Sequence, residues 1–216
     1  MGRMEVWVLF SDETRLLWKK DIAHFVLDRE VLTKPGSKFK YNGGGTSLLS
    51  DILIKKTGKP LTILAKEWLF DPLEIQNFEW VEDRNGRALA HAGLRLRPRD
   101  MLKLGRLVLN QGIWKGKQIV PKQWLDESLF RQMDSEVTLF RKDGKSLSYG
   151  YQWWLGETVL GNKRIPWSLA LGNGGQLIFV IPTFDMTIVT TAGGYGDPTQ
   201  IQKSIDLVEN LLTTVK

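Results

Sequence analysis

Residues 35–53 read PGSKFKYNGGGTSLLSDIL, and this stretch decides which fold the rest of the chain is expected to adopt. It opens with a Pro-Gly turn and continues as a short extended run. In an extended run, alternate side chains point to opposite sides, so Phe39 and Tyr41 share one side and Lys40 takes the other. The stretch therefore presents a phenol at the end of a stiff segment.

Three glycines follow Asn42, and they predict a loop because glycine accepts positive φ angles and lets other groups approach closely. Thr46 or Ser47 is then placed to cap a helix. The apolar positions of that helix recur at near-helical spacing: Leu48, Leu49, Ile52 and Leu53. The pattern predicts extended segment, glycine loop and helix, in that order.

Two interpretations of Tyr41 follow from the residues alone. A phenol held rigidly beside a glycine loop suits proton-transfer chemistry. In the second interpretation, Tyr41 is a packed aromatic residue and Gly43–Gly45 form an ordinary turn. The spacing does not decide between them.

The pattern Pro-Gly-x-x-Phe-x-Tyr, a glycine loop and Leu-Leu resembles the second conserved box of the serine β-lactamase-like superfamily. That superfamily contains class C β-lactamases, D,D-peptidases, esterases and amide hydrolases. Its box is usually Tyr-Ser-Asn or Tyr-Asn-Ser, seven residues before Leu-Leu, and Tyr41 lies seven residues before Leu48. Asn42 and Gly43 depart from the usual residues. The resemblance implies that Tyr41 is a proton shuttle and that Asn42 and Gly43 contact substrate.

By the same resemblance, a serine attacks a carbonyl with help from a lysine three residues later on one helix face. In the family this Ser-x-x-Lys box lies roughly a hundred residues before the tyrosine. Here 40 residues precede Tyr41, and Ser37 is the one serine with a lysine three residues later, Lys40. That pair falls in the extended run, where Lys40 points away from Tyr41. The nucleophile is therefore predicted to be absent.

A third family box lies on a core strand and appears here in a glycine-rich form within residues 170–176, ALGNGGQ. Small residues there would let a substrate lie along the strand edge while a backbone N–H serves an oxyanion hole. The resemblance assigns substrate binding to Gly172, Asn173, Gly174, Gly175 and Gln176. A β-bulge or tight loop entering a buried strand explains the same glycines, and this alternative stays open.

The composition excludes several classes of protein. With 42% hydrophobic residues, nine Trp and nine Phe, the chain of 216 residues has material for a core and is not disordered. The formal charge of +6 is spread among acids, which favours a solvated surface over a nucleic-acid-binding face. No segment approaches the ~18 apolar residues of a membrane helix. The apolar run 6–10 is too short for a signal peptide, and the compartment stays undetermined.

The absence of cysteine excludes disulfides, thiolate metal sites and a cysteine nucleophile. His24 and His91 are isolated and lack the spacing of metal ligands. We therefore expect neither a bound metal nor another cofactor.

The spacing of apolar residues predicts a mixture of helices and antiparallel strands, and the resemblance implies an α+β fold of the α/β sandwich type. Residues 11–145 are expected to form part of a helical subdomain that carries the tyrosine box, and residues 146–216 an antiparallel sheet packed by a C-terminal helix. Helices are expected over 11–33, from the glycines to Lys56, and over 61–70, 98–108, 123–130 and 199–215. Strands are expected over 149–154, 176–181 and 186–191, the last two as a hairpin.

The resemblance covers residues 15–195 and includes two further scaffold segments, Pro72-Leu73 with Trp80 and the run 92–105. It implies the C-terminal part of a serine hydrolase, incomplete at the N-terminus and without the Ser-x-x-Lys helix. Its substrate would be a small or peptide-like ester or amide, and a non-catalytic binding module or an inactive remnant is the alternative. An uncovered sheet edge or apolar face is expected to promote self-association.

Overall fold

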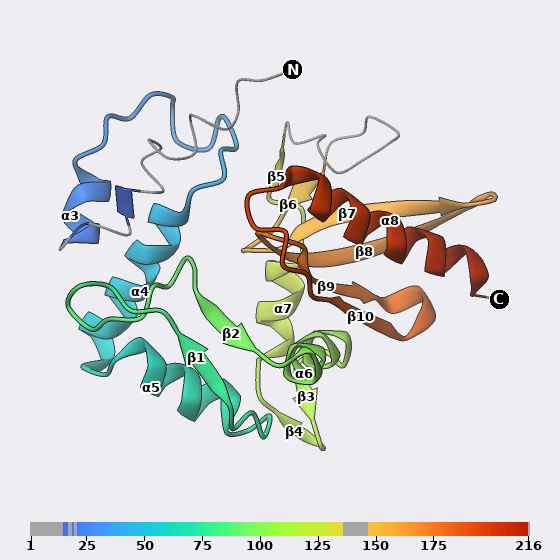
Figure 1. The fold of residues 1–216 in the computed structure, drawn as a ribbon, viewed down its shortest axis with the longest axis horizontal. Helices are drawn as coiled ribbons and strands as arrows, with labels where there is room; N and C mark the ends of the chain where they lie inside the picture. The colour runs from blue at the N-terminus through green and yellow to red at the C-terminus, as the bar shows by residue number, and fades with distance from the viewer. Residues whose placement is uncertain (1–14, 17–18, 20, 136–146, 216) are drawn as a thin grey trace. The chain divides into compact units, whose positions relative to one another are not determined.

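The computed structural model describes residues 15–16, 19, 21–135 and 147–215, and contacts divide the chain into two compact units, Met1–Leu96 and Arg97–Lys216 (Figure 1). The fold class is the expected mixture of helices and antiparallel sheet. The predicted change from a helical to a sheet portion at residue 145 stays a prediction.

The helices of the first unit begin and end at recognisable capping residues. The Asp21 side chain accepts the backbone N–H of His24 at 2.9 Å and starts α3. Gly58, with a φ of 69°, ends α4 by donating its N–H to the Ile54 carbonyl, as the sequence predicted. The described helical segments are α3 (Ile22–Leu27), α4 (Gly43–Thr57), α5 (Leu61–Ala65) and the π-helical turn η1 (Lys66–Phe70).

The predicted helix over 11–33 is wrong at its C-terminal end, and its first residues lie outside the described part of the chain. Helix α3 stops at Leu27. Val31 and Leu32 are 76% and 77% exposed, so continuing the helix would bury no apolar surface there. Short helices are stabilised chiefly by packing, and this one ends where packing ends.

A small hairpin completes the first unit. Strands β1 (Phe78–Trp80) and β2 (Leu94–Leu96) pair antiparallel. The hairpin packs through Phe78, whose ring centroid lies 4.8 Å from that of Phe70. A separate apolar cluster joins the beginning of the unit to the long connection between the strands; it contains Leu16, Ile22 and Leu89, with Phe25 and Val26 against it.

The second unit is built on one antiparallel sheet with the order β10-β9-β8-β7-β6-β5. Its strands are β5 (Met133–Asp134), β6 (Ser148–Tyr149), β7 (Trp154–Leu160), β8 (Lys163–Gly172), β9 (Gln176–Ile181) and β10 (Met186–Thr190). The hairpin of β9 and β10 is confirmed, with Met186 opposite Ile181. A separate two-stranded ribbon pairs β3 (Ile113–Trp114) with β4 (Lys117–Gln118).

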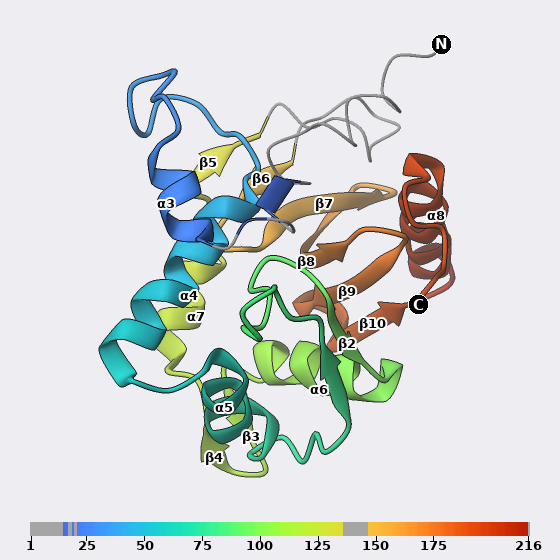
Figure 2. The ribbon, with the colours of Figure 1, turned by 60° about the vertical axis from the view of Figure 1, so that its left-hand side comes forward.

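Helices α6 (Pro98–Leu109) and α8 (Pro198–Thr214) lie on opposite faces of this sheet (Figure 2). On the α6 face, Thr187 and Ile178 approach Gly105 of the helix closely. On the α8 face, the Thr158 hydroxyl lies 3.4 Å from the Glu209 carboxylate. The short helix α7 (Lys122–Ser128) matches the helix predicted over 123–130.

The strand predicted over 149–154 is wrong, because the chain turns inside it. Gly150 donates its N–H to the Trp153 carbonyl at 2.8 Å, and Gln152 has a φ of 67°. The segment therefore divides into β6 and the start of β7, with Tyr149 opposite Trp154. Strands β7 and β8 form the longest hairpin of the sheet, and the sequence analysis did not predict them.

Candidate functional site

Tyr41 lies immediately before helix α4, at the position that the resemblance assigns to a proton shuttle. Its side chain is 48% exposed. It belongs to no described strand or helix, and helix α4 begins two residues later at Gly43. The residue is therefore about half exposed, and its role as a proton shuttle stays a prediction.

Asn42, not Thr46 or Ser47, caps helix α4, and this corrects the sequence prediction. The Asn42 Oδ1 accepts the backbone N–H of Gly44 at 2.8 Å and that of Gly45 at 3.3 Å. Asparagine is among the strongest N-cap residues, so the helix is capped four or five residues earlier than predicted. The side-chain oxygen of Asn42 therefore already accepts two backbone hydrogen bonds of the helix.

The three glycines are the first turn of helix α4 and do not form the predicted loop. A Cβ atom added at Gly44 would lie 2.8 Å from Cγ2 of Val26, a contact too short for ordinary carbon atoms. Gly43 is buried as well. Close packing of α3 on α4 therefore requires at least one of these glycines, and the contact of Gly43 with substrate stays a prediction.

Ser37 and Lys40 do not form the helical pair that acylation requires. The Ser37 hydroxyl donates to the Lys34 carbonyl at 2.6 Å in an exposed turn. Neither residue lies in a helix, so the three-residue spacing does not align their side chains on one face. This geometry agrees with the prediction that Ser37 is not a nucleophile.

The structure brings together a serine and a histidine that the sequence analysis left apart. The Ser47 Oγ lies 3.0 Å from the His91 Nδ1, and the same hydroxyl donates to the Gly43 carbonyl at 3.2 Å. Ser47 is buried in helix α4. Because the residues are 44 positions apart, no spacing rule links them, and only the fold of the first unit reveals the pair. We interpret it as a buried structural contact, since a substrate carbonyl would not reach the hydroxyl.

A cavity of about 20 Å³ lies beside this pair, which is the space of a single water molecule. Its polar lining consists of Ser47, Ser50, Asp51, Asp83 and Arg87. A cavity of this size excludes an ester or amide substrate. We therefore do not interpret this pocket as the binding cleft for such a substrate.

Asp83 is a carboxylate of this cavity whose oxygens accept several hydrogen bonds. Its side chain is 2% exposed, and Arg87 Nη2 lies 2.9 Å from it. It also accepts the backbone N–H groups of Asn85 at 2.8 Å and Arg87 at 3.0 Å. Burial raises the pKa of Asp83, but the backbone N–H groups and the Arg87 guanidinium together hold this pKa below its ordinary value.

We expect the Asp83→Asn substitution to lower the free energy of unfolding at pH 7 by about 1–3 kcal/mol, since a buried charged hydrogen-bonding group is lost. A carboxylate whose pKa is depressed on folding stabilises above its unfolded pKa, and this contribution fades as pH falls through the folded value. Urea unfolding of both proteins between pH 7 and acid should therefore show the difference shrinking at acid pH. Asp126→Asn, which removes an exposed ion pair with Lys122, is the control. A difference independent of pH would contradict the assignment.

In the second unit, the predicted substrate-binding residues form the turn between β8 and β9. Gly172 lies opposite Gln176 in the register, and Gly174 and Gly175 have φ angles of 85° and 91°. These left-handed conformations favour glycine. The turn interpretation of the glycines is thus confirmed locally, and it leaves their role in binding open.

This turn is tied to the loop that precedes helix α8. Asn173 Oδ1 accepts the Gly196 N–H at 3.2 Å, the Gln176 side-chain amide donates to the Ala192 carbonyl, and Thr190 donates to the Gly175 carbonyl at 3.0 Å. The two glycine-rich loops therefore form one cross-linked platform. The side chains of Asn173 and Gln176 each form one of the hydrogen bonds that join the two loops.

Next to this platform, one side of strand β8 has no paired strand among the described residues. Strand β7 begins at Trp154, which lies opposite Leu169, while β9 pairs with β8 as far as Gly172. Residues Ala170–Gly172 therefore have a ladder partner on the β9 side alone, within the part of the chain that the structure describes. Backbone groups on the other side are placed to pair with an extended ligand.

The two predicted sets of site residues belong to different units, and the geometry of each is defined within its own unit. Tyr41, Asn42 and Gly43 lie at the start of α4, and Gly172–Gln176 lie at the β8–β9 turn. No cluster of three or more His, Asp or Glu side chains placed to hold a metal ion occurs among the described residues. Within the same residues, no helix is both long and apolar enough to cross a membrane.

Comparisons of the sequence and of the structure with known proteins point to the same class of protein. The model of the beta-lactamase family matches residues 4–204. The 6-aminohexanoate-dimer hydrolase of Paenarthrobacter ureafaciens is 27% identical over 158 residues, which are 70% of this chain and 38% of that protein. The chain thus spans well under half of the length of this curated relative.

Solved structures share the fold. The "putative 6-aminohexanoate-dimer hydrolase" of Bacillus anthracis aligns with a TM-score of 0.71 and 25% identity, over 100% of this chain and 56% of that one. A penicillin-binding protein homologue from Caulobacter crescentus aligns with a TM-score of 0.62 and 12% identity, over 95% of this chain and 71% of the other. The second likeness shows the fold alone.

The fold and the matched segments define a protein of the class that includes β-lactamases, penicillin-binding proteins and related hydrolases. The chain belongs to the beta-lactamase family.

Proposed function

We propose that this chain supplies the substrate-binding wall and the tyrosine of a beta-lactamase-like hydrolase of amides or esters, and that by itself it forms no acyl-enzyme. The family membership supports the reaction class. The name of the Paenarthrobacter ureafaciens relative suggests a linear amide between amino-acid units as the substrate.

The open side of Ala170–Gly172 supports the binding half of the proposal. An extended amide could add to this side of β8 through main-chain hydrogen bonds. The cross-links between the β8–β9 turn and the loop before α8 keep those backbone groups in place. Such preorganisation lowers the entropy cost of binding.

The geometry of Ser37 supports the half of the proposal that concerns chemistry. In acyl transfer by this route, the serine needs a base within hydrogen-bond reach, and Ser37 instead donates to the Lys34 carbonyl. Tyr41 would carry the proton between nucleophile and leaving group, and its partial exposure is compatible with contact to a substrate. The nucleophile itself would have to come from another segment.

Binding is tested by the backbone amide resonances of the isotope-labelled chain. The linear dimer of 6-aminohexanoate should shift the resonances of residues 170–176, because these line the open side of β8. The 6-aminohexanoate monomer, which lacks the amide bond, is the matched control and should leave them in place. Equal shifts with both compounds, or no shift at these residues, would refute the binding site.

Acylation is tested by adding a chromogenic ester and a fluorescent penicillin and measuring turnover and intact mass. We expect neither turnover nor a covalent adduct. An adduct on any serine would overturn the claim that the chain cannot acylate. If turnover did occur, its loss in Tyr41→Phe but not in Tyr151→Phe, a control at a similarly exposed tyrosine, would retain the role of Tyr41.

A further inference from the structure

Asparagine precedes glycine at three places in this chain: Asn42-Gly43, Asn85-Gly86 and Asn173-Gly174. In such a dipeptide the glycine nitrogen can attack the side-chain carboxamide of the asparagine, because glycine has no Cβ atom to hinder a close approach. Whether a folded chain permits this reaction depends on how freely the backbone at the dipeptide can rotate toward the geometry of attack. The three dipeptides differ in their surroundings, and these differences appear only in the fold.

At Asn42-Gly43, the start of helix α4 holds the groups that would react. The Asn42 carboxamide oxygen accepts the N–H groups of Gly44 and Gly45 at 2.8 and 3.3 Å. Gly43 is the first residue of α4 and is buried. A Cβ atom at Gly44 would lie 2.8 Å from Cγ2 of Val26, so the helix start is also tightly packed. Rotating this backbone toward attack would break the cap and the contact of α3 with α4.

At Asn173-Gly174, the turn between β8 and β9 is held by a hydrogen bond and by an aromatic ring. Asn173 Oδ1 accepts the Gly196 N–H at 3.2 Å. The ring of Tyr195 lies close to Gly174, because a Cβ atom added at this glycine would be 3.0 Å from Cδ1 of the ring. Rotation of this dipeptide would therefore separate the two loops and displace the ring.

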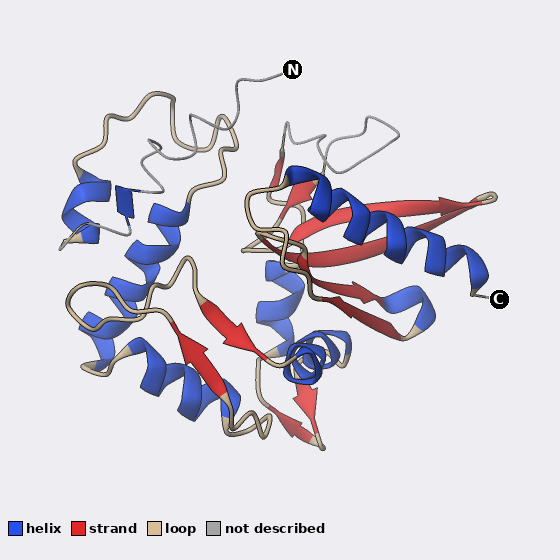
Figure 3. Ribbon diagram, viewed as in Figure 1, coloured by secondary structure: helices blue, strands red, loops and turns tan. Residues whose placement is uncertain are grey.

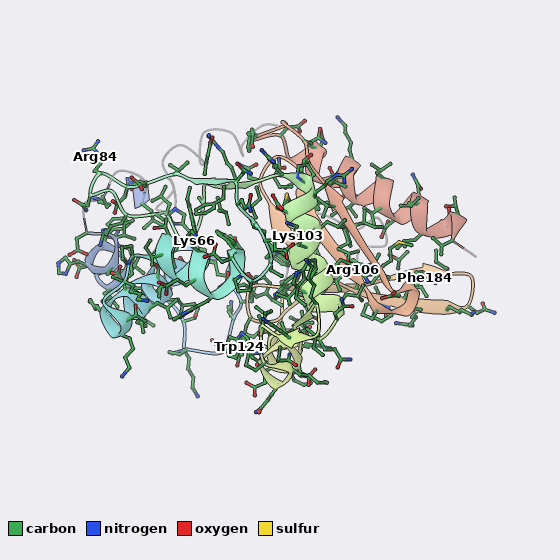
Figure 4. The ribbon with its side chains drawn as sticks, turned by 90° about the horizontal axis from the view of Figure 1, so that it is seen from below. Lys66, Arg84, Lys103, Arg106, Trp124 and Phe184 are labelled. Atoms are coloured by element: carbon green, nitrogen blue, oxygen red, sulfur yellow. The ribbon has the colours of Figure 1, made fainter. Side chains whose placement is uncertain are left out.

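At Asn85-Gly86, the surroundings of the glycine are more open. The dipeptide lies in the long connection between β1 and β2 (Figure 3), and Arg84 before it points away from the ribbon (Figure 4). The Gly86 N–H donates to the Asp83 carbonyl at 3.1 Å. Among the described residues, a Cβ atom added at Gly86 would meet only the Glu82 carboxylate, at 3.8 Å, which is an ordinary contact distance. The peptide between Asn85 and Gly86 therefore has room to rotate that the other two dipeptides lack.

We propose that Asn85 is the residue at which the folded chain deamidates, and that one product of the reaction disrupts the hydrogen bonds of Asp83. The Gly86 nitrogen forms a bond to Cγ of Asn85, and the bond from Cγ to the amide nitrogen breaks. Water carries the proton of the Gly86 N–H to the leaving amide, which departs as ammonia. The resulting succinimide then takes up a water molecule. Cleavage of the new bond to Cγ gives aspartate, whereas cleavage of the original peptide bond gives isoaspartate.

The two products differ in how they affect Asp83, whose carboxylate is 2% exposed. Its Oδ1 atom accepts the backbone N–H of Asn85 at 2.8 Å and that of Arg87 at 3.0 Å. Isoaspartate inserts an extra carbon atom into the main chain between these two donors, so they no longer converge on the same oxygen. Aspartate leaves the length of the main chain unchanged. A buried carboxylate that loses hydrogen bonds destabilises the fold, so isoaspartate is the damaging product. The inference does not depend on the proposed function.

The site is tested by incubating the folded wild-type chain in mildly alkaline buffer and following each asparagine by peptide mapping with mass spectrometry. Asn85 should react at least about tenfold faster than Asn42 or Asn173, because a hydrogen bond that restrains the reacting group is worth about the ~1.4 kcal/mol of such a rate ratio. The control is the same chain unfolded in guanidinium chloride, where the three asparagines should react at similar rates. Similar rates in the folded chain, a faster reaction at Asn42 or Asn173, or an Asn85 that stays intact would each overturn the proposal.

The effect on Asp83 is tested by comparing the isoaspartate form, separated after incubation, with the Asn85→Asp variant. Both carry the same added charge, but only the isoaspartate form has the longer main chain. We expect the isoaspartate form to unfold at a lower urea concentration than Asn85→Asp. Equal midpoints of unfolding would overturn the claim that the extra main-chain atom disrupts the hydrogen bonds of Asp83.

Discussion

Phe179→Ala should lower the free energy of unfolding of the second unit by about 3–5 kcal/mol. Phe179 is 1% exposed on the α8 face of the sheet, and its ring meets that of Trp167 edge-on at a centroid distance of 5.2 Å. Truncation removes the buried ring and leaves a cavity that the interior strands cannot close. Urea unfolding followed by circular dichroism would measure the loss.

The control for this prediction is Phe130→Ala, since Phe130 is 67% exposed. Its substitution should change stability by less than about 0.5 kcal/mol. If Phe179→Ala cost less than about 1 kcal/mol, the sheet would not pack on α8 as described.

Gly105→Ala is expected to destabilise the second unit by roughly 2 kcal/mol, against the usual preference of helices for alanine. Helix propensity alone would favour alanine by about 1 kcal/mol. The added Cβ, however, would lie 2.2 Å from Cγ2 of Thr187 and 2.8 Å from Cγ2 of Ile178. Since α6 packs directly on the sheet at this point, overpacking should exceed the gain in propensity. The midpoint of urea unfolding gives the sign.

Two further variants separate the contact from the propensity. Gly45→Ala in α4 meets no atom within 4 Å and should stabilise by about 0.5 kcal/mol or more. Thr187→Ala removes the methyl group that Gly105→Ala strikes, so the double variant should lose less than the sum of the two single losses. Strict additivity would show that α6 does not approach β10 at Gly105.

Much of the local structure was predictable because it depends on neighbouring residues. Gly58 ends α4 by taking the left-handed conformation, Pro98 and Asp100 occupy the first turn of α6, and the β9–β10 hairpin follows from two apolar strands and a short turn. The family could also be inferred, because its segments recur in order along the chain. These signals act over a few residues and need no knowledge of the fold.

The errors arose where residues distant in sequence decide the structure. The glycines at 43–45 read as a loop, but Asn42 caps them into a helix whose close approach to Val26 excludes a side chain at Gly44. Strands β7 and β8 were not predicted although Ile165, Trp167 and Leu169 alternate with less buried residues along β8, since Pro166 interrupts this run and proline argues against a strand inside a sheet.

For the candidate site, the sequence by itself determined which residues are present: a tyrosine seven residues before Leu48, a glycine-rich strand connection, and a single Ser-x-x-Lys spacing, Ser37 to Lys40, in a run without helical character. The tertiary structure alone decided which hydrogen-bond and strand partners these groups have. It engaged Asn42 as a cap, joined Ser47 to His91 across 44 residues, and left one side of β8 without a strand among the described residues. The reason is physical: residue types and spacings define which groups are available, whereas hydrogen-bond partners and burial depend on segments that meet only after folding.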